Sequence, residues 1–113
     1  MIEDRTKIIM LYDFYGALLT QIQGEYIQRH YLEDCSLTEI AEEYQVSRQA
    51  VHDALKRTVL LLNGFEDKLK LAERWEKEQI ILKQLEYEIM NPLTKIDIDK
   101  CRLLLRQVLQ SEG

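Results

Sequence analysis

The stretch SLTEIAEEYQVSRQAVHDALKR, residues 36–57, constrains the fold of this chain more than any other segment. Ser36 is followed three residues later by Glu39, and this spacing is a capping box that starts a helix. Ser47 is a second N-cap candidate ahead of another helical pattern. Two short amphipathic helices joined by a three-residue turn form a helix-turn-helix. We therefore expect one helix over 37–44 and a second beginning directly after Ser47.

Each predicted helix has one side that can pack. In the first helix the apolar residues fall at offsets of three and four: Leu37, Ile40, Ala41 and Tyr44. In the second helix one side collects Val51, Ala54, Leu55 and Thr58, and the opposite side is polar, with Gln49, His52, Asp53 and Lys56. The second helix therefore has a buried side and a side open to a ligand.

The turn between these helices has one unusual residue. The turn residue in front of Val46 is Gln45, at a position where the backbone tends towards positive φ and glycine is common. We expect a left-handed conformation there, at a cost of about 1 kcal/mol. Ala41 is predicted to lie where the helices cross most closely, and Val46 to anchor the turn.

Upstream, the sequence predicts two more helices. Apolar residues follow the helical period from about Arg5 to Leu19, and Thr20 with Gln23 forms another capping box ahead of a helix over 21–33. Helices over 21–33, 37–44 and from 48 onward make a tri-helical unit, because two short helices alone cannot bury their apolar sides. The first helix is an addition to that unit.

Downstream, the apolar residues alternate steps of four and three, which is typical of a coiled-coil seam: Val51, Leu55, Thr58, Leu62, Phe65, Leu69 and Ala72. We favour one long recognition helix that ends near Met90, before Asn91-Pro92. Asn63-Gly64 can instead cap it earlier. Such a seam needs a cover. The short final helix can cover only part of it, and the remainder is buried against the first helix or a second copy of the chain. We favour a homodimer through the long helix, and the alternative is a long helix folded wholly onto its own chain.

A last helix is predicted near the end of the chain. Thr94 with Asp97 can cap it, and its buried stripe is expected to contain Cys101, Leu104, Leu105 and Val108. The fold class is therefore all-α: a tri-helical helix-turn-helix with an added N-terminal helix, a long extended recognition helix and a C-terminal helix. We expect residues 1–113 to form a single domain, with the helix-turn-helix core at about 20–62 and a helical extension at about 63–113.

Composition excludes several classes of protein. With 113 residues of which 46% are hydrophobic, the chain can build a core, so disorder is not expected. The N-terminal residues do not resemble a signal peptide, and no apolar run approaches the length of a membrane span, so we expect a cytoplasmic protein without membrane contact. Cys35 and Cys101 lack ligand spacing and are expected to be unpaired thiols.

Nothing in the sequence indicates an enzyme. His30 and His52 are each isolated from any nucleophile or ligand cluster, and His30 is placed like an ordinary core histidine. The chain has no glycine-rich phosphate loop and no metal-ligand spacing. We therefore predict no catalytic residues, no cofactor and no metal.

Net charge argues against strong non-specific binding to DNA. Twenty acids face fifteen bases, and no basic tail is present to hold a phosphate backbone. Positive charge is nevertheless concentrated in the second motif helix, where Arg48, Lys56 and Arg57 outnumber Asp53. Only this helix is suited to phosphate.

The candidate nucleic-acid-binding residues all lie on that helix or at its start: Ser47, Arg48, Gln49, His52, Lys56 and Arg57. Ser47 either donates to a phosphate or only caps the helix. Gln49 can pair with adenine, and Arg48 can clamp phosphate or guanine. His52 and Lys56 suit a base or a phosphate. The alternative for each is a solvated surface residue.

Asp53 favours a different reading of the same face. A carboxylate there repels phosphate unless it accepts a hydrogen bond from a cytosine amine. It is well suited to face a basic protein partner.

Several segments of this sequence resemble a known protein family. SLTEIAEEYQVSRQAV, followed by Asp53, Lys56 and Arg57, resembles the YlxM family of small bacterial proteins, as do FYGALLT (14–20) and YLED (31–34) upstream. The helix-turn-helix is also similar to the fourth region of bacterial sigma factors, which binds promoter DNA. The resemblance covers the first 70 residues and implies an all-helical protein linked to the signal recognition particle pathway. Where the family pattern has tyrosine and glycine, this chain has His52 and Gln45, so no base contact is carried over.

Two functions follow from this sequence. The first is a DNA-binding transcription regulator that reads DNA with the second motif helix, with its dimer presenting two such helices to neighbouring half-sites. The second is a non-DNA-binding adaptor that uses the same face to bind a protein or RNA component of the signal recognition particle. Motif geometry favours the first, and net acidity with Asp53 favours the second.

Overall fold

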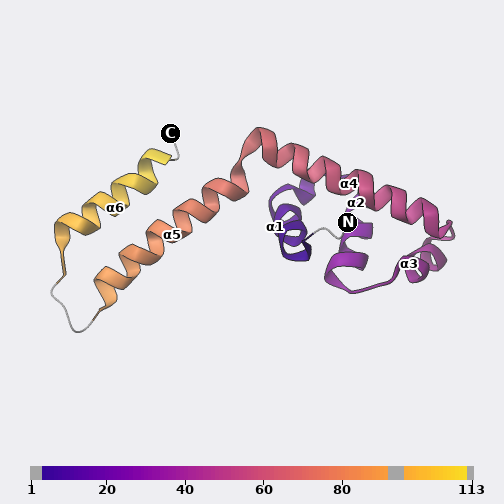
Figure 1. Ribbon diagram of the computed structural model, residues 1–113, viewed down its shortest axis with the longest axis horizontal. Helices are drawn as coiled ribbons and strands as arrows, with labels where there is room; N and C mark the ends of the chain where they lie inside the picture. Colours follow the sequence, from indigo (N-terminus) through magenta and orange to yellow (C-terminus); the bar gives the residue numbers. More distant parts are fainter. Residues whose placement is uncertain (1–3, 92–95, 112–113) are drawn as a thin grey trace. The chain divides into compact units, whose positions relative to one another are not determined.

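The computed structural model describes residues 4–91 and 96–111, and every regular element within those ranges is helical. The helices are α1 (Arg5–Tyr15), η1 (Gly16–Leu18), α2 (Gln21–Ile27), η2 (Gln28–Leu32), α3 (Leu37–Tyr44), α4 (Arg48–Leu69), α5 (Leu71–Met90) and α6 (Ile98–Ser111) (Figure 1). The chain divides into two compact units, residues 1–72 and 73–113. The all-α fold with its helix-turn-helix is confirmed.

The two motif helices begin where the capping residues predict. Ser36 Oγ accepts a hydrogen bond from the Glu39 amide at 3.1 Å, and Glu39 Oε1 accepts from the Ser36 amide at 2.9 Å. This second bond is the main reason that the pKa of Glu39 lies below its usual value. At the next helix, Ser47 Oγ accepts from the Ala50 amide at 3.0 Å. The bounds of α3 and the start of α4 therefore agree with the prediction.

The turn between α3 and α4 contains the expected left-handed residue. Gln45 has φ 55° and ψ 46°, and the Val46 amide donates to the Ala41 carbonyl at 3.0 Å. Ala41 is buried, as predicted for the point where the helices cross. The prediction that the Val46 side chain anchors the turn is wrong, since this side chain is 41% exposed. The turn is instead held by the amide of Val46.

The first helix ends earlier than predicted, whereas the second ends near its predicted bound. The chain leaves the α-helical path after Tyr15, tightens into the 3₁₀ turn η1, and becomes extended at Leu19, ahead of the Thr20 cap. A Cβ atom on Gly16 would lie 2.9 Å from the Tyr12 ring, so this close approach requires glycine. The helix predicted over 21–33 is α2 followed by the π-helical η2, which ends at Leu32.

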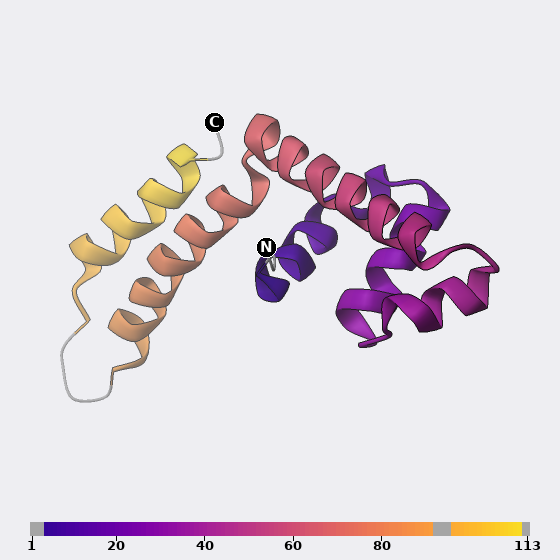
Figure 2. The same cartoon turned by 45° about the vertical axis from the view of Figure 1, so that its right-hand side comes forward.

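The core of unit 1 forms where α4 lies across α1, α2 and α3 (Figures 1 and 2). From α4 the buried side chains are those of Val51, Leu55, Thr58, Val59 and Leu62. The first part of the predicted seam is therefore covered by the chain's own helices, which was the alternative to a second copy. Asn63-Gly64 does not interrupt α4, and Asn63 Nδ2 donates to the Val59 carbonyl at 3.0 Å.

The prediction of one helix running on to Met90 is wrong, because α4 ends at Leu69 and Lys70 adopts φ 57°. Tyr15 of α1 fixes this break. Its hydroxyl donates to Glu66 Oε1 at 2.5 Å and accepts from the Leu71 amide at 3.0 Å. Glu66 Oε1 also accepts from the Ala72 amide at 3.0 Å, so the first amides of α5 have partners. Tyr15 is fully buried, and burial raises its pKa.

Unit 2 is a helical hairpin in which α5 and α6 run side by side in opposite directions in both Figure 1 and Figure 2. An ion pair of 3.3 Å between Lys100 Nζ and Glu88 Oε2 joins them. The cap of α6 is Asp97, whose Oδ1 accepts from the Lys100 amide at 3.0 Å. Thr94, the other predicted cap residue, lies outside the described residues.

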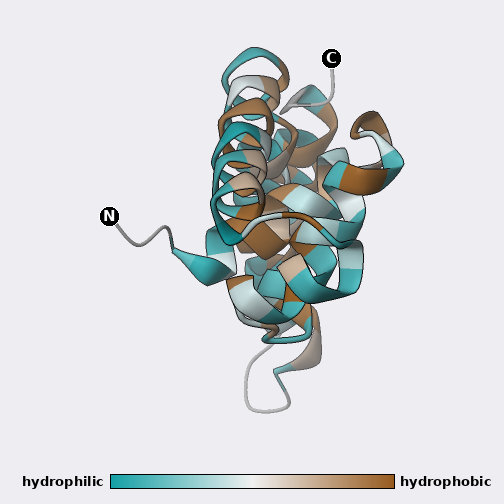
Figure 3. Ribbon diagram, turned by 90° about the vertical axis from the view of Figure 1, so that its right-hand side faces the viewer, coloured by the Kyte–Doolittle hydropathy of each residue, from teal (hydrophilic) through white to brown (hydrophobic). Residues whose placement is uncertain are grey.

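The predicted stripe of α6 is partly correct. Leu104 and Val108 are buried and Cys101 is half-buried, but Leu105 is 47% exposed, contrary to the prediction. The reason is that the contact with α5 covers a narrower side of α6 than the apolar pattern occupies. Figure 3 shows hydrophobic and hydrophilic stretches alternating along the helices, as amphipathic helices require.

We expect Tyr15→Phe to lower the free energy of unfolding by about 1–3 kcal/mol, because it removes a buried hydroxyl that bonds both Glu66 and an amide of α5. Tyr12→Phe is the control, since Tyr12 accepts a single exposed hydrogen bond from Gln28 Nε2 at 2.6 Å. Urea unfolding followed by circular dichroism measures both. Equal stabilities of the two variants would show that the Tyr15 hydroxyl does not fix the helix break.

We expect Gln45→Gly to raise the free energy of unfolding by about 0.5–1 kcal/mol, because glycine adopts φ 55° without Cβ strain. Glu42→Gly is the control. It places glycine inside α3, where φ is helical, and is expected to cost about 1 kcal/mol. The same urea titration tests the pair, and a Gln45→Gly variant as unstable as Glu42→Gly would contradict the assigned strain.

Candidate nucleic-acid interface

The structure brings the six sequence-predicted candidates together at the start of α4. Their side chains are all exposed: Ser47, Arg48, Gln49, His52, Lys56 and Arg57. On the reverse of the same helix Val51 and Leu55 are buried in the core of unit 1. The burial of one side therefore presents the polar side to solvent.

Ser47 has a structural role at this surface. Its hydroxyl oxygen accepts from the Ala50 amide, as an N-cap does. The hydroxyl proton is not used in that bond, so it can still be donated. The other free amides of the first turn point out of the helix and give this end partial positive charge.

Asp53 organises two of the candidates. Gln49 Nε2 donates to Asp53 Oδ1 at 3.0 Å, and His52 Nδ1 lies 3.4 Å from the same oxygen. The bond from Gln49, followed by that from His52, lowers the pKa of Asp53, so its carboxylate is charged at neutral pH. The exposed face thus contains a fixed negative charge between its polar residues.

This arrangement determines which atoms of Gln49 face solvent. A carboxylate can only accept hydrogen bonds, so the Gln49 nitrogen, and not its oxygen, must face Asp53. The oxygen Oε1 and the second N–H of Nε2 are then available. Sequence reasoning placed Asp53 on this face but did not find that it holds Gln49, although their separation of four residues is the spacing at which such pairs form on a helix.

The cations on this face are exposed, whereas Arg29 of η2 is held in ion pairs. Within residues 4–91 and 96–111, Arg48, Lys56 and Arg57 are exposed and form no ion pair within 4 Å. Arg29 of η2, by contrast, bonds Glu43 at 3.1 Å and Glu33 at 2.9 Å, and these carboxylates raise its pKa. The two carboxylates neutralise the charge of Arg29, so Arg29 does not add to the positive charge of the exposed side of α4.

Neither cysteine and neither histidine belongs to a metal cluster in the part of the chain that the structure describes. His30 Nδ1 donates to the Cys35 carbonyl at 2.9 Å, which is the satisfied histidine that the sequence suggested. Burial raises the pKa of the Cys35 thiol. Among the described helices, none is both long enough and apolar enough to cross a bilayer.

Comparison with known proteins supports the helix-turn-helix assignment. The profile of a family described as "Putative helix-turn-helix protein, YlxM / p13 like" (UPF0122) matches residues 2–101. A UPF0122 protein of Bacillus thuringiensis (strain Al Hakam) is 48% identical over 85 residues, covering 75% of this chain and 77% of that protein. A UPF0122 protein of Halalkalibacterium halodurans is 43% identical over 98 residues, covering 87% and 90%. This chain therefore belongs to the UPF0122 family of YlxM/p13-like helix-turn-helix proteins.

Proposed function

We propose that this chain is a DNA-binding regulatory protein that reads DNA with the exposed side of α4, and that it acts in connection with the signal recognition particle pathway. The observation that carries the DNA-binding part is the six-residue polar surface at the start of α4, backed by a buried apolar side. A helix presented in this way fits the major groove with its N-terminal residues on base edges. Membership of a helix-turn-helix family supports the proposal.

The candidates divide into base readers and phosphate contacts. Gln49, held by Asp53, offers Oε1 and one N–H, which match the N6 amine and N7 of adenine. Arg48 is placed for guanine or for phosphate, and Lys56 and Arg57 are placed for phosphate. Ser47 adds a hydroxyl donor at the helix end. Asp53 argues against a surface that binds only the DNA backbone, because its negative charge repels phosphates whatever the DNA sequence.

Acidity supports a second candidate. Residues 1–72 hold twelve acids and eight bases, and Asp53 sits within the proposed reading surface. A surface with this charge also suits a basic protein. The alternative function is therefore an adaptor for a component of the signal recognition particle, with α4 as the docking helix.

The two candidates are separated by titrating the purified chain against genomic DNA fragments and against particle components at two salt concentrations. For a DNA reader we expect a sequence-dependent signal and an affinity that falls steeply with salt. Tight binding of a particle component, with no DNA retarded at low salt, would transfer the function to the adaptor.

We expect Lys56→Ala to weaken binding to all DNA sequences alike and to reduce the slope of log K against log salt by about 1, because one phosphate contact is lost. Lys68→Ala is the matched control, an exposed lysine at the far end of the same helix. Arg48→Ala and Gln49→Ala should lower sequence discrimination without unfolding the protein. Gel retardation of specific and random duplexes measures these effects. If Lys56→Ala and Lys68→Ala behave alike, the assigned surface is wrong.

We expect Asp53→Asn to increase affinity for random DNA by about threefold to tenfold at low salt, because a charge facing the phosphates is removed. Discrimination at the base pair read by Gln49 should fall, because an asparagine side chain no longer dictates which way the Gln49 amide points. Asp67→Asn, an exposed carboxylate near the end of α4, is the control. An Asp53→Asn variant with unchanged discrimination would contradict the orienting role of Asp53.

A further inference from the structure

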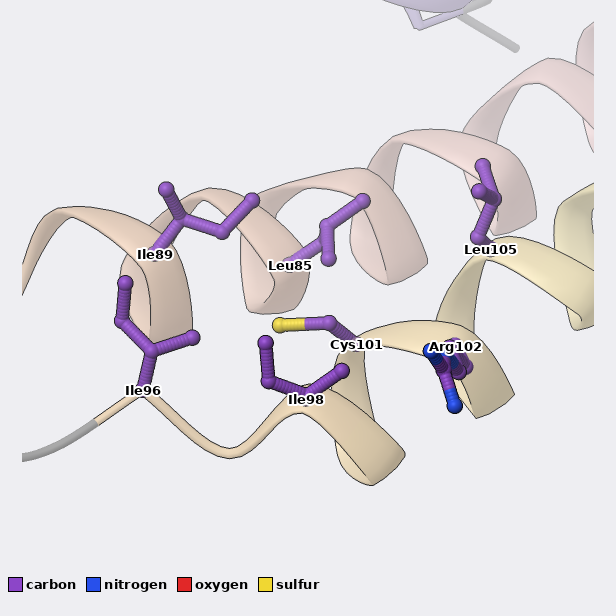
Figure 4. Close-up of a pocket in the computed structure, with 7 residues that line it drawn as sticks. All are labelled: Leu85, Ile89, Ile96, Ile98, Cys101, Arg102 and Leu105. Carbon is purple, nitrogen blue, oxygen red and sulfur yellow. The ribbon is translucent and has the colours of Figure 1, made fainter.

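We propose that the α5–α6 hairpin is a dimerisation surface on which a second copy of this chain packs, forming a four-helix bundle. The starting observation is an open apolar groove of about 280 Å³ along one side of the hairpin (Figure 4). Leu85 and Ile89 line it from α5, and Ile98, Cys101, Arg102 and Leu105 line it from α6.

The groove belongs to a longer apolar surface with the repeat of packed helices. Leu82 and Ile89 are seven residues apart on α5, and both are exposed. On α6, Ile98 and Leu105 are also seven residues apart, and Leu109 follows four residues later. Ile98 is 57% exposed and Leu109 62% exposed. Seven-residue spacing is typical of helices that pack along their length, so both helices have a second packing stripe beside the one that joins them.

The hairpin alone cannot bury these stripes. Among residues 73–91 and 96–110, only Leu104 and Val108 are buried. At about 1.5 Å per residue, α5 with 20 residues is about 30 Å long and α6 with 14 residues about 21 Å, so the side that both helices share is roughly 21 Å by 20 Å. Packing two hairpins face to face would therefore supply the core that each one lacks.

Charge identifies the occupant as a second copy. On α5, residues 73–90 carry five acids and three bases, whereas α6 carries one acid and three bases. Residues 73–113 together have eight acids and seven bases, which does not suit a strongly charged partner such as nucleic acid. The hairpin is complementary to itself. Placing α5 of one copy on α6 of the other pairs opposite charges, whereas α5 on α5 would pair like charges.

The ion pair within the hairpin fixes the register of this arrangement. Lys100 is level with Glu88, since the two side chains are 3.3 Å apart. Antiparallel helices rise by equal steps, so Arg102 is level with Glu86. A two-fold axis parallel to the helices keeps these levels and places Glu86 of one copy opposite Arg102 of the second copy. Both side chains are exposed beside the apolar stripes, at the rim of the interface.

The first test is the oligomeric state of the full chain, measured by sedimentation over a hundredfold concentration range without DNA. We expect a monomer–dimer equilibrium whose Kd rises at least about a hundredfold in Leu105→Glu. Leu103→Glu is the matched control, because Leu103 is a 54% exposed leucine of α6 outside the groove lining. Its Kd should change by less than about threefold. A parent chain that stays monomeric, or equal effects of the two substitutions, would overturn the proposal.

The second test examines the pairing of α5 of one copy with α6 of the other. It also tests the proposal if circular dichroism shows that Leu105→Glu has lost helix content. Glu86→Arg and Arg102→Glu are each expected to raise Kd about tenfold, since each places like charges opposite one another twice in the dimer. Combining them should restore Kd to within about threefold of the parent. A double variant as weak as the product of both single effects would overturn the proposed arrangement.

Discussion

The burial of one side of α4 against α1, α2 and α3 is the constraint on which the rest of unit 1 depends. Val51, Leu55 and Leu62 enter the core, and this sets the rotation of the helix about its own axis. The exposed side, with Gln49 and Lys56, follows from that rotation. A surface presented by a packed helix is more rigid than one on a loop, which suits recognition of base edges at fixed spacing.

Local signals made most of unit 1 predictable. Ser36, Thr20 and Ser47 each start a helix through contacts within three residues, so the sequence alone is enough to find these bounds. The left-handed turn residue, Gln45, was found for the same reason. The end of α4 at Leu69 was not predictable in this way. It depends on a hydrogen bond between Tyr15 and Glu66, which are 51 residues apart, and helical periodicity contains no trace of it.

At the candidate site, too, the pattern of exposed residues was predictable from the sequence, whereas the contacts between side chains were not. Periodicity placed Gln49, His52 and Lys56 on one side, because it reports which residues share a face, and all three are exposed in the structure. It did not report which side chains bond one another on that face. Asp53 therefore appeared as an isolated charge that opposed DNA binding, whereas in the structure it holds Gln49 and approaches His52. Similarly, the seam predicted that its apolar residues need a cover, but only the structure showed that Val51, Leu55 and Leu62 are covered within unit 1 whereas Leu69 is 47% exposed.

The hydroxyl of Tyr15 has a consequence for how the chain is assembled. Lys70 is left-handed only at an energetic cost, and that cost is offset by bonds that require α1 to be in place. While α1 is absent from its site, during synthesis or after local unfolding, the bond from the Leu71 amide to the Tyr15 hydroxyl is lost, whereas the bond from the Ala72 amide to Glu66 continues to support the left-handed Lys70. The docking of the earliest helix therefore stabilises the point at which α4 ends and α5 begins.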